Sequence, residues 1–255
     1  MVAALLGTLA AIAVAETMVG TEGADQLVGT PSPDQLYGEG GADRLDGAGS
    51  NDYLEGGSGD DKVGGGDGLD LAIGGTGSDR IDAGPGDDVV YAGADQDVVL
   101  GGRGADTLFG QAGSDRLFGG SGADRIYASL GGDFVHAGSG ADRISSDQDD
   151  VTIVAGSGDD VVTADGGNVR VRGGSGNDRI RTGLGSDRVN GGRGEDSIDT
   201  GAGDDAVRAA DGARDRVRCG SGTDSATVDP IDLVSECEEL LQGARRSRDL
   251  GRGSG

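Results

Sequence analysis

Apolar and polar residues recur along most of this chain with a fixed period of nine. From Gly20 the nonapeptides read GTEGADQLV, GTPSPDQLY, GEGGADRLD and so on to TGAGDDAVR, which ends at Arg208, giving 21 copies without a change of phase. The eighth position is Leu, Ile or Val in 20 copies, the sixth is Asp in 19 and the fourth is Gly in 17. A fixed period of this kind indicates a solenoid, in which each repeat packs only on its neighbours.

The second half of each nonapeptide predicts a short strand. Strand alternation directs position 8 to one face and positions 7 and 9 to the other. Two facing stacks would then bury one aliphatic side chain per nonapeptide in a thin, continuous core. The glycine-rich first half predicts tight turns, because glycine readily adopts positive φ and lets backbone carbonyls approach a ligand. We therefore expect an all-β solenoid.

The repeats resemble the hemolysin-type calcium-binding repeats of RTX proteins, whose pattern is G-G-x-G-x-D-x-U-x, and residues 119–127 (GGSGADRIY) and 173–181 (GGSGNDRIR) are near-perfect copies. The resemblance implies a right-handed parallel β-roll with two short strands and two turns per coil, and Ca²⁺ as the ligand. Calcium accepts about six to eight hard oxygen ligands, which carbonyls and Asp carboxylates supply. Aligned carboxylates on stacked coils would lie about 4.8 Å apart and would repel each other without a cation between them. Ordinary turn chemistry is the alternative for Asp and Gly, but it would not keep Asp at one fixed position.

Because each coil takes two nonapeptides, alternate repeats turn at opposite edges and predict two rows of metal ligands. One row is Asp34, Asp52, Asp70, Asp88, Asp106, Asp124, Asp142, Asp160, Asp178 and Asp196. The other is Asp25, Asp43, Asp61, Asp79, Asp97, Asp115, Asp133, Asp187 and Asp205, interrupted by Val151 and Val169 in turns that carry Asp147 and Asp165 at position 2. Counting neighbouring pairs gives about 16 calcium ions as an upper estimate. We expect the interrupted stretch to bind calcium weakly or not at all.

The composition and net charge of the chain bear on whether it folds without a bound cation. The chain has 255 residues with 55 Gly, 4 Tyr, 3 Phe, 46 acids and 21 bases, for a net charge of −25. Such a charge excludes an electrostatic nucleic-acid binder. Low hydrophobicity with high net charge is typical of disorder, so we expect the chain to fold on binding Ca²⁺ and to be largely disordered without it.

The two ends of the chain differ from the repeats. Residues 2–14 are apolar, and Ala13-Val14-Ala15 resembles a cleavage site, so we expect a signal peptide over residues 1–15. The apolar run is too short to span a bilayer. A small buried helix is the alternative. The roll is expected over 16–227, a disulfide-linked cap over 228–243 and a disordered basic tail over 244–255. An even number of cysteines in an exported chain favours a Cys219–Cys237 disulfide. The closing segment resembles that of bacterial, often actinobacterial, proteins of this type, and we expect a secreted, extracellular protein without a transmembrane span in its mature form.

Catalysis is not expected. His136 is the single histidine, and the sequence has no H-E-x-x-H, G-x-S-x-G or Walker motif. The leading hypothesis is a secreted calcium-binding protein with a structural or adhesive role toward a cell-surface or matrix partner. The alternative is a calcium-triggered export or folding module of a toxin or exoenzyme system whose effector domain is absent from this chain.

Aromatic residues form a row of their own. Tyr91, Phe109 and Tyr127 occupy position 9 in successive coils, with Phe118 on the opposite sheet. This predicts an outward ladder that is either a docking patch for a partner, glycan or second roll, or ordinary cross-strand packing.

Overall fold

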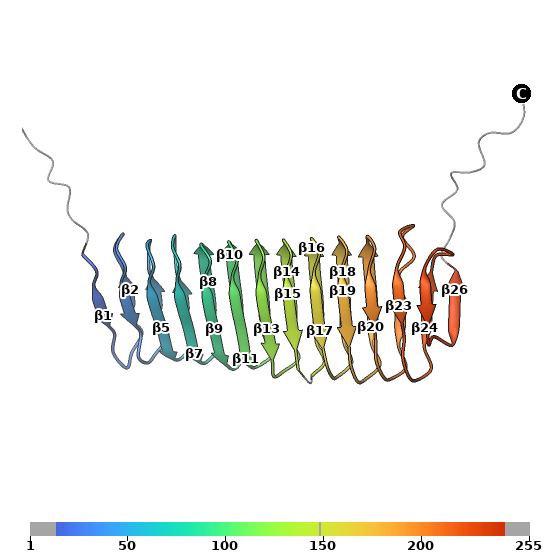
Figure 1. Ribbon diagram of the computed structural model, residues 1–255. Coiled ribbons are helices and arrows are strands. Elements are labelled where there is room, and N and C mark those ends of the chain that lie inside the picture. Colours follow the sequence, from blue (N-terminus) through green and yellow to red (C-terminus); the bar gives the residue numbers. More distant parts are fainter. Residues whose placement is uncertain (1–13, 148, 243–255) are drawn as a thin grey trace, which may run out of the picture.

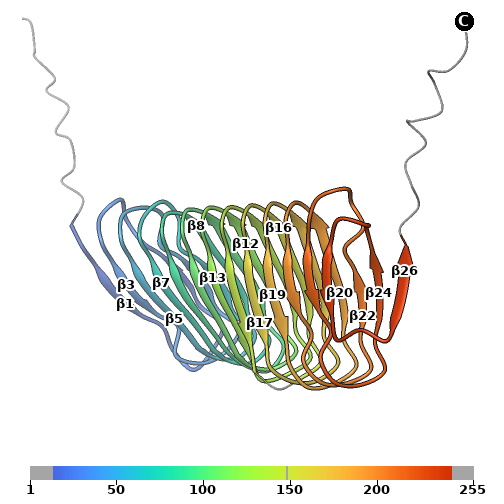
Figure 2. The same ribbon diagram turned by 45° about the vertical axis from the view of Figure 1, so that its right-hand side comes forward.

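The fold is a long parallel β-roll. The computed structural model describes residues 14–147 and 149–242, and these form strands and turns without any helix. The predicted signal peptide (residues 1–13 of it) and the basic tail lie outside the described residues. Figure 1 shows the strands following one another in chain order along the roll, and Figure 2 shows them on two opposite walls. Within the described part of the chain, no helix is long and apolar enough to cross a membrane.

Two parallel sheets of 13 strands each form these walls. Sheet A contains the odd-numbered strands: β1 (Thr17–Val19), β3 (Gln35–Tyr37), β5 (Tyr53–Ser58), β7 (Leu71–Thr76), β9 (Val89–Ala94), β11 (Thr107–Ala112), β13 (Arg125–Ser129), β15 (Arg143–Ser146), β17 (Val161–Ala164), β19 (Arg179–Thr182), β21 (Ser197–Asp199), β23 (Arg216–Arg218) and β25 (Leu233–Ser235). Sheet B contains the even-numbered strands: β2 (Gln26–Val28), β4 (Arg44–Asp46), β6 (Lys62–Gly64), β8 (Arg80–Pro85), β10 (Val98–Arg103), β12 (Arg116–Ser121), β14 (Phe134–Ser139), β16 (Thr152–Ser157), β18 (Arg170–Ser175), β20 (Arg188–Arg193), β22 (Ala206–Arg208), β24 (Ser225–Val228) and β26 (Glu239–Gln242).

Strand register follows the sequence period. In sheet A, Val89 pairs with Thr107, and in sheet B, Val98 pairs with Arg116, so in these coils a residue lies beside the one 18 positions further on. Among the described strands, the offset differs only after β22 and at one shift in β13. One coil therefore takes two nonapeptides. The predicted parallel β-roll is confirmed.

The core is wider than one aliphatic side chain per nonapeptide. Position 8 is buried throughout the central coils, as at Leu108 and Leu117. Most strands of these coils continue past position 9, so position 1 also faces inward, and Ala83 and Ala92 are fully buried there. The expectation of one inward apolar residue per repeat therefore fails in the repeats with alanine at position 1, where the strand buries a second apolar side chain.

Glycine is required where neighbouring coils approach most closely. Gly102, at position 2, has a φ of 114°, and an added Cβ would collide with the carbonyl oxygen of Gly84 on the preceding coil. Any side chain there would separate the stacked strands. The repeated glycines thus set the spacing of the coils as well as the shape of the turns.

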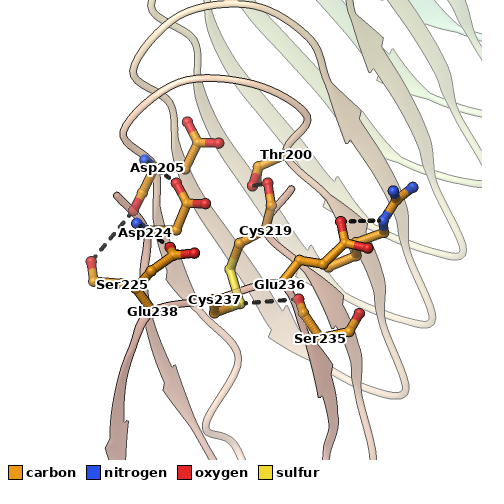
Figure 3. The surroundings of a disulfide bond; sticks show 10 residues. Thr200, Asp205, Cys219, Asp224, Ser225, Ser235, Glu236, Cys237 and Glu238 are labelled. Carbon is orange, nitrogen blue, oxygen red and sulfur yellow. Dashed lines mark hydrogen bonds and ion pairs between the residues drawn. A yellow bond between two sulfur atoms is a disulfide. The ribbon is translucent and has the colours of Figure 1, made fainter. Parts of the chain in front are cut away.

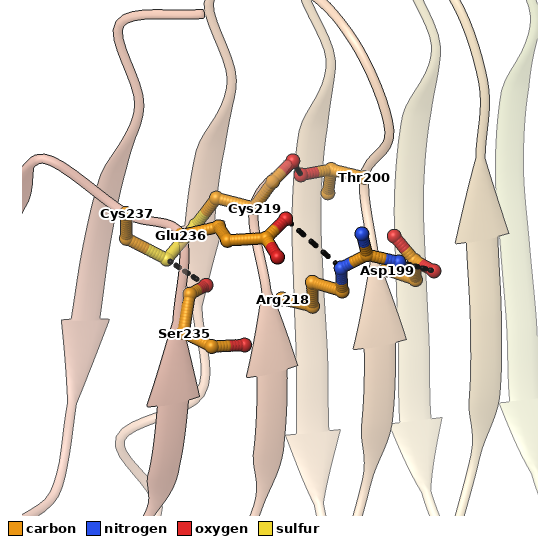
Figure 4. A network of polar contacts seen from close by, with 7 residues as sticks. All are labelled: Asp199, Thr200, Arg218, Cys219, Ser235, Glu236 and Cys237. Atoms are coloured by element: carbon orange, nitrogen blue, oxygen red, sulfur yellow. Dashed lines mark hydrogen bonds and ion pairs between the residues drawn. A yellow bond between two sulfur atoms is a disulfide. The ribbon is translucent and has the colours of Figure 1, made fainter. Parts of the chain in front are cut away.

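The C-terminal segment continues both sheets. β25 pairs with β23 and β26 pairs with β24, both in parallel. A Cys219–Cys237 disulfide joins this last coil to the preceding one across a sequence separation of 18 (Figure 3). Beside it, the Arg218 guanidinium lies 3.0 Å from Glu236 and 3.7 Å from Asp199 (Figure 4). The last coil is therefore held by a covalent bond and an ionic contact in addition to strand pairing.

Candidate metal centre: two ladders of buried aspartates

Each position-6 aspartate precedes a strand and points into the roll. In the central coils these side chains are almost completely buried; Asp106 and Asp124, for example, have no exposed surface. One carboxylate oxygen, Oδ1, accepts a hydrogen bond from the backbone N–H of the position-6 residue one coil earlier, as when Asp88 donates to Asp106 at 2.9 Å. Repetition of this bond links the aspartates into a ladder along each edge.

The structure brings the predicted residues together as two such ladders. The first row precedes the strands of sheet A and runs from Asp34 to Asp196 without a missing rung. The second row precedes the strands of sheet B and runs from Asp25 to Asp133, then from Asp187 to Asp205. The sequence therefore predicted correctly which aspartates share an edge.

The second carboxylate oxygen has no partner in most of these side chains. Oδ2 is buried and accepts no hydrogen bond at Asp43, Asp52, Asp61, Asp70, Asp79, Asp88, Asp97, Asp106, Asp115, Asp124, Asp133, Asp142, Asp160, Asp178, Asp187, Asp196, Asp205, Asp215 and Asp224. At the N-terminal end, the backbone N–H of Thr21 satisfies Asp25 and that of Thr30 satisfies Asp34. A buried, unpaired carboxylate oxygen costs several kcal/mol unless a cation or donor compensates it. The ladders thus present a row of oxygens that lack a counterpart.

Backbone carbonyls face the same space as these free oxygens. A Cβ added to Gly101 would lie 2.5 Å from Asp106 Oδ2 and 2.6 Å from the Gly119 carbonyl oxygen of the next coil. At Gly110 the corresponding distances, to Asp115 Oδ2 and to the next coil's carbonyl oxygen, are 2.9 and 3.0 Å. Within residues 14–147 and 149–242, no three Asp, Glu, His or Cys side chains converge on one point. A cation held here would take single carboxylate oxygens together with carbonyls, a hard-oxygen donor set that suits calcium.

Comparison with known families agrees with this geometry. The sequence model for the RTX calcium-binding nonapeptide repeat matches in overlapping copies from residue 19 to residue 214. The chain belongs to the RTX calcium-binding nonapeptide repeat family. No curated protein matches it. Membership in this family makes the chain a calcium-binding repeat protein.

Burial alters the acidity of the RTX ladders. Desolvation raises the pKa of Asp79, Asp106, Asp133 and Asp160 to about 7, opposed by the rung hydrogen bond and reinforced by neighbouring carboxylates. Asp34, at the N-terminal end, differs, because hydrogen bonds from the Thr30 and Glu16 backbone outweigh desolvation and lower its pKa. Without a cation, these four rungs therefore take up protons near neutral pH.

A second set of hydrogen bonds, not anticipated from the sequence, forms at position 5 in some of the coils. Asp87 accepts a hydrogen bond from the Ala105 N–H of the following coil at 2.7 Å, and Asp159 accepts one from Asn177 at 2.7 Å. These bonds run in the opposite direction along the roll from those of position 6. The signal was present in the sequence as Asp-Asp pairs, in which the first aspartate occupies position 5 and the second occupies position 6.

The interrupted stretch of the RTX roll is packed as core. Val151 and Val169 are 1% and 0% exposed and belong to the apolar cluster, so they take the aspartate position with an apolar side chain. The N–H of Asp133 donates to the Gly131 carbonyl instead of to a carboxylate. Asp147 and Asp165 are exposed and do not replace the missing rungs.

Two further aspartates, Asp215 and Asp224, belong to the ladders but do not keep the nine-residue spacing from the earlier repeats. Asp215 accepts the rung bond from Asp196 N–H and Asp224 accepts it from Asp205 N–H, both at 2.8 Å and across 19 residues rather than 18. The ladders then end on Asp232 and Glu238, whose side chains accept the N–H groups of Asp215 and Asp224. The signal was the spacing of nine between Asp215 and Asp224, displaced by one inserted residue.

Proposed function

We propose that this protein is secreted, folds when calcium fills its two aspartate ladders, and acts outside the cell as a non-catalytic structural or adhesive element. One observation carries the proposal: the row of buried Oδ2 atoms without a hydrogen-bond partner. A carboxylate row at this depth is unfavourable for the polypeptide alone and favourable once divalent cations lie between the rungs.

Each ion would be held by oxygens of successive coils on one edge. The ligands would be Oδ2 atoms of neighbouring rungs, such as those of Asp88 and Asp106, and carbonyls of the glycine-rich turns. A bound ion would supply positive charge that offsets the repulsion between carboxylates of adjacent coils. Adding Asp215 and Asp224 to the ladders raises the upper estimate to about 18 ions.

Folding is expected to depend on this binding. The net charge of −25 opposes compaction, and the narrow core does not offset chain entropy by itself. Divalent ions on both ladders would cancel the acid excess. The full chain should therefore be unfolded in chelator and folded in calcium.

Circular dichroism and calorimetry of the full chain test the proposal. We expect a β-sheet spectrum in millimolar calcium, its loss in excess chelator, and no comparable recovery with magnesium, which tolerates this flexible ligand set less well. Isothermal titration should show many ions per chain. A β-sheet spectrum that persists after complete removal of calcium would contradict folding on metal. Recovery of the protein from culture supernatant tests secretion.

A further inference from the structure

One part of the roll surface carries no charge. The strands β7, β9 and β11 of sheet A read LAIGGT, VVYAGA and TLFGQA, without a single acidic or basic residue. Their outward side chains are Leu71, Ile73, Val89, Tyr91, Thr107 and Phe109, which alternate with the buried positions. We call these six residues the neutral face. In a chain with a net charge of −25, a continuous apolar surface of this kind marks a site of association.

The stacking of the aromatic rings on this surface favours a second sheet over a sugar ring as the ligand. Tyr91 and Phe109 are stacked with their centroids 4.7 Å apart and their planes 5° apart, and Tyr127 continues the stack at 4.8 Å and 8°. The faces of the inner ring are therefore covered by its neighbours, and ring edges point outward. A sugar ring that binds by lying flat on an aromatic face would therefore find neither face of Phe109 free. A second flat, apolar sheet packs well against such edges.

The charges that border the neutral face are arranged symmetrically about β9. Glu55 lies on β5 and Arg125 lies on β13, each two strands from β9 in sheet A. A two-fold axis parallel to the strands, passing over β9, would place β5 of one copy over β13 of another. Glu55 would then approach Arg125 of the second copy twice in the same interface. Their offset of two residues along the strand, about 6.6 Å, is within the span of an Arg side chain.

We propose that two copies of this chain associate through the neutral face, in an isologous dimer with its two-fold axis over β9. The contact area sets the strength. Five strands of five or six residues cover roughly 500 Å² per copy, less than the roughly 800 Å² of a standard interface. The dimer is accordingly weak and reversible. It also requires calcium, because two chains of −25 charge repel until the ladders are filled, so this inference rests on the proposed function.

Sedimentation velocity over a concentration series in calcium tests the dimer. The Tyr91→Asp variant places a charge at the centre of the face and should weaken dimerisation at least tenfold. Phe118→Asp is the matched control, since Phe118 holds the same repeat position on sheet B and should leave the dimer intact. Circular dichroism of each variant confirms that it folds. A folded wild-type chain that stays monomeric at the highest concentration overturns the inference, whereas a chain that does not fold in calcium contradicts the proposed function instead.

Charge reversal tests the two-fold arrangement itself. Glu55→Arg alone and Arg125→Glu alone each create like-charge contacts and should weaken the dimer. The double variant restores opposite charges and should recover most of the wild-type affinity. Failure of the double variant to exceed both single variants would overturn the proposed axis.

Discussion

Replacing the two apolar rungs by carboxylates should lengthen the calcium ladder on sheet B. Val151 and Val169 occupy the rung position and are buried in the core cluster. In the double variant Val151→Asp/Val169→Asp, the interval between Asp133 and Asp187 would contain three further pairs of neighbouring carboxylates. The variant should bind three more calcium ions than the wild-type chain.

The sign of the stability change depends on calcium concentration. Removing two buried Val side chains costs about 3 kcal/mol, and the two new buried carboxylate oxygens cost about 2 kcal/mol each before calcium binds. Each added site contributes about 2.7 kcal/mol when calcium is at a hundredfold excess over its dissociation constant, and three sites contribute about 8 kcal/mol. The variant should thus be about 1 kcal/mol more stable than wild type at that excess. Below about fifty times the dissociation constant, the two costs outweigh the binding term and the variant is the less stable protein.

Urea unfolding at a series of free calcium concentrations, with titration calorimetry for the number of ions, measures both effects. The control Thr152→Asp/Val154→Asp adds the same charge to outward positions of β16 and should leave the number of ions unchanged. Stability curves of variant and wild type that never cross, or an unchanged number of bound ions, would refute the role assigned to the rungs.

Three further outcomes are expected. Burial raises the pKa of Asp106 from its ordinary value of 3.8 to about 7, so this group binds its proton more tightly in the folded calcium-free chain than in the unfolded one. The stability that this proton contributes is fully present below about pH 4 and is lost as the pH rises through about 7. Acidification of the apo protein should therefore increase its β-sheet signal. Asp106→Asn removes one charge shared by two neighbouring sites and should cost about 5 kcal/mol in hundredfold calcium excess, while the exposed Asp82→Asn should cost little in the same urea titration. Reduction of Cys219–Cys237 should lower stability by about 3 kcal/mol, and hydrogen exchange should then rise first in the last coil; uniform protection before and after reduction would contradict its local role.

The period in the sequence was enough to predict the register of the roll. A one-residue slip would turn every position-8 side chain out of the core, so the aliphatic column admits only the 18-residue pairing seen between neighbouring coils. The same constraint placed each aspartate on its edge. Fold and ladder membership were therefore predictable from two columns of the repeat.

The inserted residue near the C-terminus was harder to interpret because it falls in a turn. The turn after Arg208 lengthens the repeat by one residue, and Asp211 accepts hydrogen bonds from the N–H groups of Gly194 and Ala213 within it. Strand pairing then resumes, with Ser225 beside Ala206. A turn can absorb an extra residue that a strand cannot, so a fixed count loses Asp215 and Asp224 although the ladder continues through them.

The direction of the hydrogen bonds could not be obtained from composition at all. At position 6 the N–H of one coil reaches forward to the next carboxylate, whereas at position 5 the N–H of a coil reaches back to the preceding one. At position 6, one oxygen of most carboxylates accepts a backbone hydrogen bond, and the other has no hydrogen-bond partner and could bind a cation. At Val151 and Val169 both oxygens are lost, and the coils there are held by apolar packing on one edge and the continuous carboxylate ladder on the other. The two edges consequently differ in kind: the edge beside sheet A carries buried carboxylates over its whole length, and the edge beside sheet B contains a segment with apolar rungs.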